Sequence, residues 1–412
     1  MARLLTICPY DLIPLRGGGA LRSFHLLGQL ARFHEVHAIL FQSEASLRKE
    51  AEGYKVPDNV RIYSPIDTPA PRMWFDCLPR RIGPGLKYRW LRRSWQGPAE
   101  GELLSCHHLI RKVLGSQQID AVVFEHRGTM KASPLVRRLC PSARLVLNTH
   151  NVDYRLMVEE SSLGGTRECT PAMQKALARI QWEEDHLGRF VDAVWTCSEE
   201  DRRVLTAHNS IPCSVIPNGV DCSFFSFDAN PSKAQSPFLI FTGALGTEAN
   251  KDAVTWLIRD LWPRIVNERP DLRLLLVGAG MPAALAEEAR AVPGVEVTGE
   301  VPDVRPYFQK ASVALVPLRI GSGTRLKIME AMAQGNPVIS TGKGAEGLEV
   351  TDGEHLLLAN ESGSLVQTLL RLLSDPARFH RLRQSARSFV EQRYDWNVIG
   401  NLANQAIDEI LR

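Results

Sequence analysis

The chain has 412 residues, which is too long for a single hydrophobic core and indicates two or three domains. Its composition, 44% hydrophobic and 23% charged, excludes a largely disordered protein. A net charge of +3 does not call for nucleic acid, and we expect none as a partner. Eight cysteines without a C-x-x-C pair indicate reduced thiols in a cytoplasmic protein, and no apolar run reaches the ~18 residues that span a bilayer.

Short apolar runs bounded by Gly, Pro or Asp alternate with longer segments of helical period, which predicts an α/β fold with parallel sheets. Strands are predicted in the first half at 4–9, 36–41, 60–65, 120–125, 144–150 and 192–198. In the second half they are predicted at 238–243, 272–278, 295–299, 312–318 and 336–341. The repeated pattern indicates two Rossmann-like domains.

The domain bounds follow from composition. We expect a first domain at 1–215, a linker rich in Pro, Asn and Ser at 216–237, and a second domain at 238–394. The remaining residues, 395–412, have apolar side chains at helical spacing, and we expect this helix to pack back on the first domain.

One stretch departs from the alternation. Residues 72–95 carry seven Arg or Lys against one Asp, with three tryptophans between them. One interpretation is a solvated loop and helix whose tryptophans fill the nearby core. The other is peripheral contact with an anionic membrane or a lipid-linked acceptor, because Trp and Arg suit that interface.

A triple glycine follows the first predicted strand and opens the next helix, at Gly17, Gly18 and Gly19. Glycine lets the backbone approach an anion closely, and a helix N-terminus supplies free N–H groups with partial positive charge. A phosphate site is one interpretation, and a tight turn without ligand is the other, since the spacing is not G-x-G-x-x-G.

The segment 312–341 is more specific, because it predicts a strand, a glycine loop, a helix, a turn and a strand in succession. Backbone amides of its loop can bind a pyrophosphate at the helix start. Arg325 and Lys327 add two positive charges there, and Glu330 can accept hydrogen bonds from two ribose hydroxyls. The alternative is that these are ordinary residues of a helix surface. The loop residues are Gly321, Ser322, Gly323 and Thr324.

Polar side chains lie at the carboxyl ends of two predicted strands in the first half of the chain. His150 ends the predicted strand at 144–150, with Asn151 and Asp153 just after it, and Glu125 ends the strand at 120–125, with His126 next. Ligands of open α/β sheets bind at such carboxyl ends, so His150 is a catalytic candidate, and a structural histidine is the alternative. Glu125, His126 and Asp153 are secondary candidates for the acceptor side, and for Glu125 and His126 the alternative is that they are solvated loop residues.

These segments resemble glycosyltransferase family 4, and the likeness covers nearly the whole chain. It rests on the triple glycine, THNVD at His150, VIPNGVD at 215, FTGALGTEANKDA at 241, VTGEVPDVRPYFQKA at 297, and LKIMEAMAQGNPVIST followed by GAEGL at 344. The resemblance implies the GT-B fold, in which two Rossmann-like domains face each other across a cleft. It also implies that the domain at 1–215 binds the acceptor and that the domain at 238–394 binds the nucleotide sugar. It further implies a metal-independent, usually retaining transferase without a cofactor.

The resemblance also implies roles for single residues. Glu330 matches the ribose-binding glutamate of the family, His150 its histidine near the transferred sugar, and Gly17 to Gly19 its phosphate-side loop. One position departs, because Ser322 stands where the family often has a second glutamate that contacts the donor sugar.

A second departure concerns the cations of the family. Its usual Arg and Lys after the first strand of the second domain are replaced by Ala244 and Asn250, with Lys251 next to the latter. Our hypothesis is that Arg325 and Lys327 supply the charge that cleavage of a sugar–phosphate bond needs.

The sequence therefore predicts a hexosyl-type glycosyltransferase, with a UDP-sugar as the expected donor and a saccharide, lipid-linked or small-molecule acceptor. Its setting would be polysaccharide or glycolipid and glycoconjugate biosynthesis, in the cytoplasm or at the cytoplasmic face of a membrane. Two alternatives stay open. A nucleotide-sugar epimerase or hydrolase would act without an acceptor, and a degenerate module would bind sugar nucleotide without catalysis.

Overall fold

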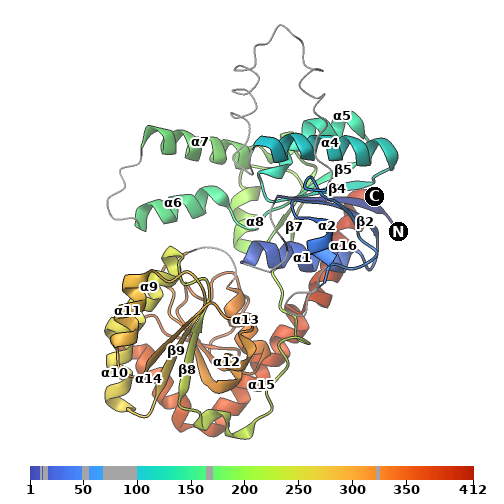
Figure 1. The fold of residues 1–412 in the computed structure, drawn as a ribbon. Coiled ribbons are helices and arrows are strands. Elements are labelled where there is room, and N and C mark those ends of the chain that lie inside the picture. The colour runs from blue at the N-terminus through green and yellow to red at the C-terminus, as the bar shows by residue number, and fades with distance from the viewer. Residues whose placement is uncertain (10–11, 13–16, 49–54, 68–99, 164–169, 322–324) are drawn as a thin grey trace. The chain divides into compact units, whose positions relative to one another are not determined.

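A computed structural model describes most of the chain as two compact units (Figure 1). The described residues are 1–9, 12, 17–48, 55–67, 100–163, 170–321 and 325–412. Unit 1 comprises Met1–Val152, Gln181–Ile216 and Gly400–Arg412, and unit 2 comprises Asp153–Ile180 and Pro217–Ile399. The basic stretch 72–95 and three of the predicted loop residues, Ser322, Gly323 and Thr324, lie outside the described residues.

Unit 1 is built on a seven-stranded parallel sheet with the order β3-β2-β1-β4-β5-β6-β7. The chain moves outward from β1 through β2 to β3, then returns to the other side of β1 with β4. The two directions of crossover therefore diverge between β1 and β4, whose carboxyl ends adjoin. The strands are β1 Arg3–Cys8, β2 Glu35–Leu40, β3 Arg61–Tyr63, β4 Ala121–Glu125, β5 Arg144–Asn148, β6 Ala193–Thr196 and β7 Cys213–Val215.

The centre of the sheet of unit 1 is interior, because β1, β4 and β5 are almost entirely buried. Parallel strands covered on both faces are expected to be continuous apolar runs of this kind. The principal helices that connect these strands are α1 Gly18–Leu30, α2 Glu44–Arg48, α4 Glu100–Ser116, α5 Ser133–Leu139 and α8 Glu199–Thr206. Between β5 and β6 the chain forms α6 Asp153–Leu163 and α7 Pro171–Asp185.

Unit 2 repeats this order with six parallel strands, β10-β9-β8-β11-β12-β13. Its crossovers diverge between β8 and β11, which are neighbours in the sheet. Figure 1 shows α9, α10 and α11 on one face of this sheet and α12 and α13 on the other. The strands are β8 Phe238–Thr242, β9 Arg273–Val277, β10 Val295–Gly299, β11 Ala311–Val316, β12 Val338–Ser340 and β13 Leu357–Leu358.

From β8 onward, helices follow most strands of unit 2, and α6 with the first part of α7 also belongs to this unit. The first helix after β8, α9, continues through a π-helical turn at Leu257–Leu261 into α10. The helices that follow the strands are α9 Glu248–Trp256, α10 Trp262–Glu268, α11 Ala283–Ala291, α12 Arg305–Lys310, α13 Leu326–Ala333, α14 Ser362–Ser374 and α15 Pro376–Arg393.

The C-terminal helix α16, Trp396–Leu411, has residues in both units. The part of α16 that belongs to unit 1, which begins at Gly400, packs closely on α1, because a Cβ atom added to Gly400 would lie 2.6 Å from the side-chain oxygen of Gln29. A larger residue at position 400 would force these helices apart.

The structure confirms the α/β fold and all eleven predicted strands, each within two residues of its predicted ends. Two strands of the described chain, β7 and β13, were not predicted. They have three and two residues, which is too short for a period to show.

The segment 216–237, predicted as a linker, contributes to the core of unit 2. Val220, Cys222 and Phe225 are buried among its hydrophobic residues. The ammonium of Lys233, 1% exposed, pairs with Asp228 at 2.8 Å. This segment is therefore part of the packed structure of unit 2, although several of its polar residues, such as Ser223 and Asn230, are exposed.

Two further findings concern the described residues. None of their helices is both long and apolar enough to cross a membrane. The six cysteines among them form no disulfide, and burial raises the pKa of Cys106 to about 12.

Candidate functional site

The candidate donor site lies in unit 2, at the carboxyl ends of β8 and β11. Open α/β sheets bind ligands where the crossovers diverge, and these two strands flank that point. After β11, the predicted glycine loop leads into α13, which begins at Leu326 with Arg325 at its N-cap. Lys327 and Glu330 are therefore on this helix.

The ammonium of Lys327 reaches across to the end of β8. Its Nζ donates a hydrogen bond to Oδ1 of Asn250 on α9 at 2.8 Å and lies 4.1 Å from the ring centroid of Phe241. Gly243 makes this approach feasible, since an added Cβ atom would lie 2.8 Å from Nζ. An ammonium from another helix therefore lies beside Asn250, the position where the resemblance led us to expect a lysine.

The pKa of Lys327 is lowered to about 7. The main cause is burial, which disfavours the charged ammonium, and the neighbouring Arg325 adds repulsion, whereas Glu330 acts in the opposite direction. The site therefore holds an amine whose charge a bound anion would stabilise.

The pKa of Glu330 is shifted in the opposite direction to that of Lys327. Burial raises the pKa of its carboxyl to about 7, against the opposing attraction of Lys327. Within the described part of the chain, its carboxylate accepts no hydrogen bond. Two opposite charges with few protein partners thus lie one turn apart on α13.

Arg325 has a different environment. Burial lowers the pKa of its guanidinium, and the carboxylates of Glu346 and Glu159 oppose that shift. Glu346 also pairs with Lys343 at 2.5 Å and with Arg155 at 3.3 Å. Arg325 therefore lies beside an ionic cluster within unit 2.

The backbone conformation at position 321 explains why a glycine is found there. Its φ of +106° is in the region that favours glycine, and an added Cβ would lie 3.0 Å from a guanidinium nitrogen of Arg325. The close approach of this guanidinium to the turn therefore depends on the missing side chain.

In unit 1, polar groups meet at the corresponding point, the carboxyl ends of β1, β4 and β5. Glu125 ends β4 and is 2% exposed. Its Oε2 accepts hydrogen bonds from the hydroxyl of Ser23 at 2.6 Å, from Nδ2 of Asn148 at 2.8 Å and from Nε2 of His150 at 3.2 Å. Two predicted candidates, Glu125 and His150, are therefore in direct contact.

A buried cation extends this network. Arg22, 1% exposed, donates from Nε and Nη2 to Oδ1 of Asn148 at 3.1 and 2.7 Å. Sequence reasoning missed Arg22, Ser23 and Asn148. An available signal was the position of Arg22 and Ser23 inside an otherwise apolar helical run just after the triple glycine.

His126 follows Glu125 in a conformation that is uncommon for a residue with a side chain, with φ of +74°. Its Nδ1 accepts a hydrogen bond from the Gly128 N–H at 3.2 Å, and its ring lies edge-on to that of His150, with 6.3 Å between centroids. His126 is thus a second imidazole at the same strand ends.

The remaining candidates lie at two helix starts. Gly17 caps α1 with φ of +87°, and Gly18 and Gly19 form its first turn, so the triple glycine does open this helix. Asp153 is the first residue of α6 and belongs to unit 2, whereas Glu125, His126 and His150 belong to unit 1.

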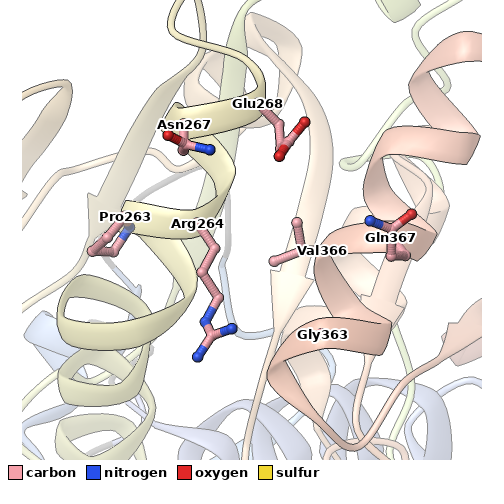
Figure 2. Close-up of a pocket in the computed structure, with 7 residues that line it drawn as sticks. All are labelled: Pro263, Arg264, Asn267, Glu268, Gly363, Val366 and Gln367. Carbon is pink, nitrogen blue, oxygen red and sulfur yellow. The ribbon is translucent and has the colours of Figure 1, made fainter.

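An open groove of about 580 Å³ lies elsewhere on unit 2, between α10 and α14 (Figure 2). None of the candidate residues lines it, so its position does not support the proposed chemistry. Its lining residues are Pro263, Arg264, Asn267, Glu268, Gly363, Val366 and Gln367. A metal site is not indicated either, because no three His, Cys, Asp or Glu side chains of the described residues are grouped to hold an ion.

Two family models match the chain. The model described as Glycosyltransferase Family 4 matches residues 16–224, and the model described as Glycosyl transferases group 1 matches residues 236–375. The chain belongs to glycosyltransferase family 4. The first match contains the network of unit 1, and the second contains Lys327 and Glu330.

Curated relatives of this family member are distant. An uncharacterised 44.6 kDa protein in the cps region of Klebsiella pneumoniae is 22% identical over 164 residues, which is 38% of this chain and 42% of that protein. The phosphatidyl-myo-inositol mannosyltransferase of Mycobacterium leprae is 29% identical over 262 residues, 60% of this chain and 67% of that protein. The chain spans from about two fifths to two thirds of the first curated relatives that it matches.

Solved structures of similar fold cover the chain more fully. Sucrose-phosphate synthase from Thermosynechococcus elongatus superposes with a TM-score of 0.70 at 17% identity, covering 100% of this chain and 99% of that one. HepE of Anabaena in complex with UDP gives a TM-score of 0.67 at 15% identity, covering 99% and 100%. Together with the two parallel sheets, these similarities confirm the predicted GT-B fold.

Proposed function

We propose that this protein is a glycosyltransferase that moves a hexose from a nucleotide-diphosphate sugar to a saccharide or lipid-linked acceptor, in polysaccharide or glycolipid biosynthesis. Family membership supports transfer in general. The mannosyltransferase relative acts on a phosphatidyl-inositol acceptor by its name, and the similar HepE structure holds UDP. A UDP-sugar remains our expected donor.

The observation that carries this proposal is the ammonium of Lys327 on Asn250, at the carboxyl end of β8. The usual cations of the family are absent from Ala244 and Asn250. Lys327 provides one at the same strand end, and Arg325 provides another at the helix N-cap. Two cations at a leaving diphosphate stabilise the charge that develops as the sugar departs.

Glu330 and His150 complete the proposed roles. The Glu330 carboxylate accepts hydrogen bonds from the ribose hydroxyls, for which its unused acceptors are suited. For His150 we propose the role that the family resemblance implies, which is contact with the transferred sugar. The amides of the 321–324 loop and the N-terminus of α1 at Gly17 to Gly19 contact the phosphates.

The proposed chemistry needs neither a metal nor a cofactor. The acceptor hydroxyl attacks the face from which the diphosphate leaves, and a diphosphate oxygen takes its proton, so that the configuration is retained. Proton NMR of the product's anomeric centre tests this route, and an inverted linkage would refute it. We propose the cytoplasmic face of a membrane as the setting.

We favour a working transferase over the degenerate binding module, because the ammonium of Lys327 lies beside Asn250, where the family's usual cation is absent. An epimerase or hydrolase has no feature of its own in the described residues to support it. The two classes differ in turnover. A binding module gives heat with a sugar nucleotide in calorimetry but releases no nucleotide, whereas a hydrolase releases it without an acceptor.

The first experiment is a thermal-shift screen with UDP-glucose, UDP-N-acetylglucosamine and GDP-mannose. It identifies both the nucleobase and the sugar of the donor that the protein binds. One donor should raise Tm, and Arg325→Ala should then lower its turnover by about 10²-fold or more. A protein that none of these nucleotides stabilises, and that releases no nucleotide, would contradict the proposal.

A further inference from the structure

The side chain of Asn250 bears on how Lys327 acts, and this inference rests on the proposed function. We propose that Asn250 is a positioning residue for Lys327. Its carboxamide oxygen holds the ammonium at the carboxyl end of β8, and because the carboxamide is neutral, the charge of that ammonium stays available to the diphosphate of the donor.

The ammonium of Lys327 is enclosed by groups at the end of β8 and on α9. Its Nζ donates to Oδ1 of Asn250 at 2.8 Å, lies 4.1 Å from the ring centroid of Phe241 and passes over Gly243, which has no Cβ to obstruct it. Among the described residues, Oδ1 of Asn250 is the only hydrogen-bond acceptor of this ammonium. An aromatic ring attracts the charge but does not orient a single N–H, so the direction of the ammonium depends on Asn250.

The two neighbours of the Asn250 carboxamide allow it only one orientation. Its Nδ2 donates to the carbonyl oxygen of Ala244 at 2.8 Å, and a carbonyl offers only acceptors. An ammonium offers only donors, so the carboxamide oxygen must face Lys327. An amide satisfies both neighbours at once, whereas an aspartate or a lysine at this position would satisfy one and repel the other.

Asn250 is itself held by the start of α9. It is 9% exposed and lies in the first turn of this helix, where its backbone N–H donates to the hydroxyl of the N-cap residue Thr247 at 3.4 Å. The Ala244 carbonyl also accepts from the N–H and the hydroxyl of Thr247, at 3.1 and 3.2 Å. The turn therefore has hydrogen bonds of its own, and a change of the Asn250 side chain should leave it in place.

The neutrality of Asn250 matters because few groups compensate the charge of Lys327. The charged groups that act on it are on its own helix segment, where Arg325 disfavours the ammonium and Glu330 favours it. The contacts from β8 and α9, Phe241 and Asn250, are uncharged. Burial lowers the pKa of Lys327 to about 7, and a hydrogen bond to the ammonium opposes this shift. Asn250 in this way supports the charge without cancelling it.

The test combines two variants with a measurement that needs no substrate. Asn250→Leu keeps the shape of the side chain but removes the acceptor, and Asn250→Asp keeps an acceptor but adds a negative charge. The ¹³Cε signal of Lys327, assigned by its loss in Lys327→Met, reports the pKa of the amine in the ligand-free protein. We expect this pKa to be lower than in wild type in Asn250→Leu and higher than in wild type in Asn250→Asp.

Turnover supplies the second measurement, as nucleotide release at pH 7 from the donor that the screen selects. We expect kcat to fall by about 10- to 100-fold in Asn250→Leu, because the amine is less protonated and no longer held. In Asn250→Asp the donor KM should rise by about tenfold or more, because the carboxylate cancels the charge that the diphosphate needs. In a Lys327→Met background, Asn250→Leu should have no further effect, because residues that act as a unit are not additive.

Thr247→Val is the matched control. Thr247 lies in the same turn and donates to the same carbonyl of Ala244, but its hydrogen bonds in the described chain do not involve Lys327. This variant removes the hydroxyl that caps α9, so it should lower Tm without changing kcat or the pKa of Lys327.

Two results would overturn the inference: a pKa of Lys327 that is the same in wild type and in both variants, or equal kcat losses from Asn250→Leu with and without the amine of Lys327. Should Asn250→Leu fail to fold, the pKa of Lys327 in Asn250→Asp still decides. Absence of any turnover in wild type would contradict the proposed transferase, whereas the pKa measurement would still decide whether Asn250 holds the ammonium.

Discussion

The two units have sheets of the same order, yet the polar groups at their divergence points differ in how far the protein satisfies them. In unit 1, the carboxylate of Glu125 accepts three hydrogen bonds, and Arg22 is bonded to Asn148 through two nitrogens. In unit 2, Lys327 donates to Asn250, and the carboxylate of Glu330 has no hydrogen-bond donor among the described residues.

The polar groups of unit 1 are therefore preorganised by their hydrogen bonds, whereas those of unit 2 lack partners that would stabilise their charges. Buried polar groups with complete partners hold a geometry, whereas buried charges with few partners destabilise the free protein and favour a ligand that completes them. Within unit 1, the imidazole of His150 contacts a well-partnered carboxylate. Within unit 2, Lys327 and Glu330 are groups whose charged forms the sugar nucleotide of our proposal would stabilise.

The largest expected effect comes from removing the cation of unit 2. Lys327→Met keeps the length and the apolar stem but lacks the ammonium, so turnover should fall by about 10³-fold, measured as nucleotide release. Lys251→Met is the control, because Lys251 is next to Asn250 in sequence but pairs with Glu248 at 2.5 Å. If Lys251→Met lost turnover while Lys327→Met kept normal rates, the cation that acts on the diphosphate would be Lys251 of α9, which would contradict our assignment to Lys327 of α13.

Glu330→Gln should separate binding from stability. The pKa of Glu330 is raised above its unfolded value, so its ionisation reduces stability as pH rises from about 4.5 to 7, and the full penalty is present at pH 8. The neutral amide removes that penalty. At pH 8, Tm without nucleotide should be at least that of wild type, while the donor KM rises by about 10- to 100-fold. A Tm several degrees lower would indicate a structural role for Glu330.

The parts that sequence could predict are those with a local signal. Long apolar runs located the strands, and the resemblance located Glu330 and His150 without their surroundings. The partners came from elsewhere in the chain, because Lys327 and Asn250 are 77 residues apart and Arg22 and Asn148 are 126 apart. Asn250 looked like a lost lysine in the sequence, and only the packing of α13 against the end of β8 shows which amine contacts it.

Donor affinity should peak near neutral pH, with an effect of up to about tenfold per pH unit. Both relevant groups have a pKa near 7. Above that pH Lys327 loses the proton that a diphosphate favours, and below it Glu330 gains a proton that removes a ribose acceptor. The sugar nucleotide that the screen selects is a suitable probe, because its diphosphate diester does not titrate in this range.

Isothermal titration calorimetry from pH 5.5 to 8.5 measures this profile. Lys327→Met should abolish the decline at high pH, and Glu330→Gln should abolish the decline at low pH. A flat profile in wild type would show that the two groups do not exchange protons with solvent when the donor binds.

The smallest effect is expected from Ser23→Ala, which tests how complete the network of unit 1 is. The Ser23 hydroxyl donates one of three hydrogen bonds to Oε2 of Glu125, and the donors from Asn148 and His150 remain in the variant. Loss of one neutral donor should destabilise the protein by about 1 kcal/mol and lower kcat by less than about tenfold. Denaturant unfolding and nucleotide release measure the two quantities. If kcat instead fell as far as in Lys327→Met, the geometry of unit 1 would depend on each single donor, and the contrast between a redundantly held site and a sparsely partnered one would no longer hold.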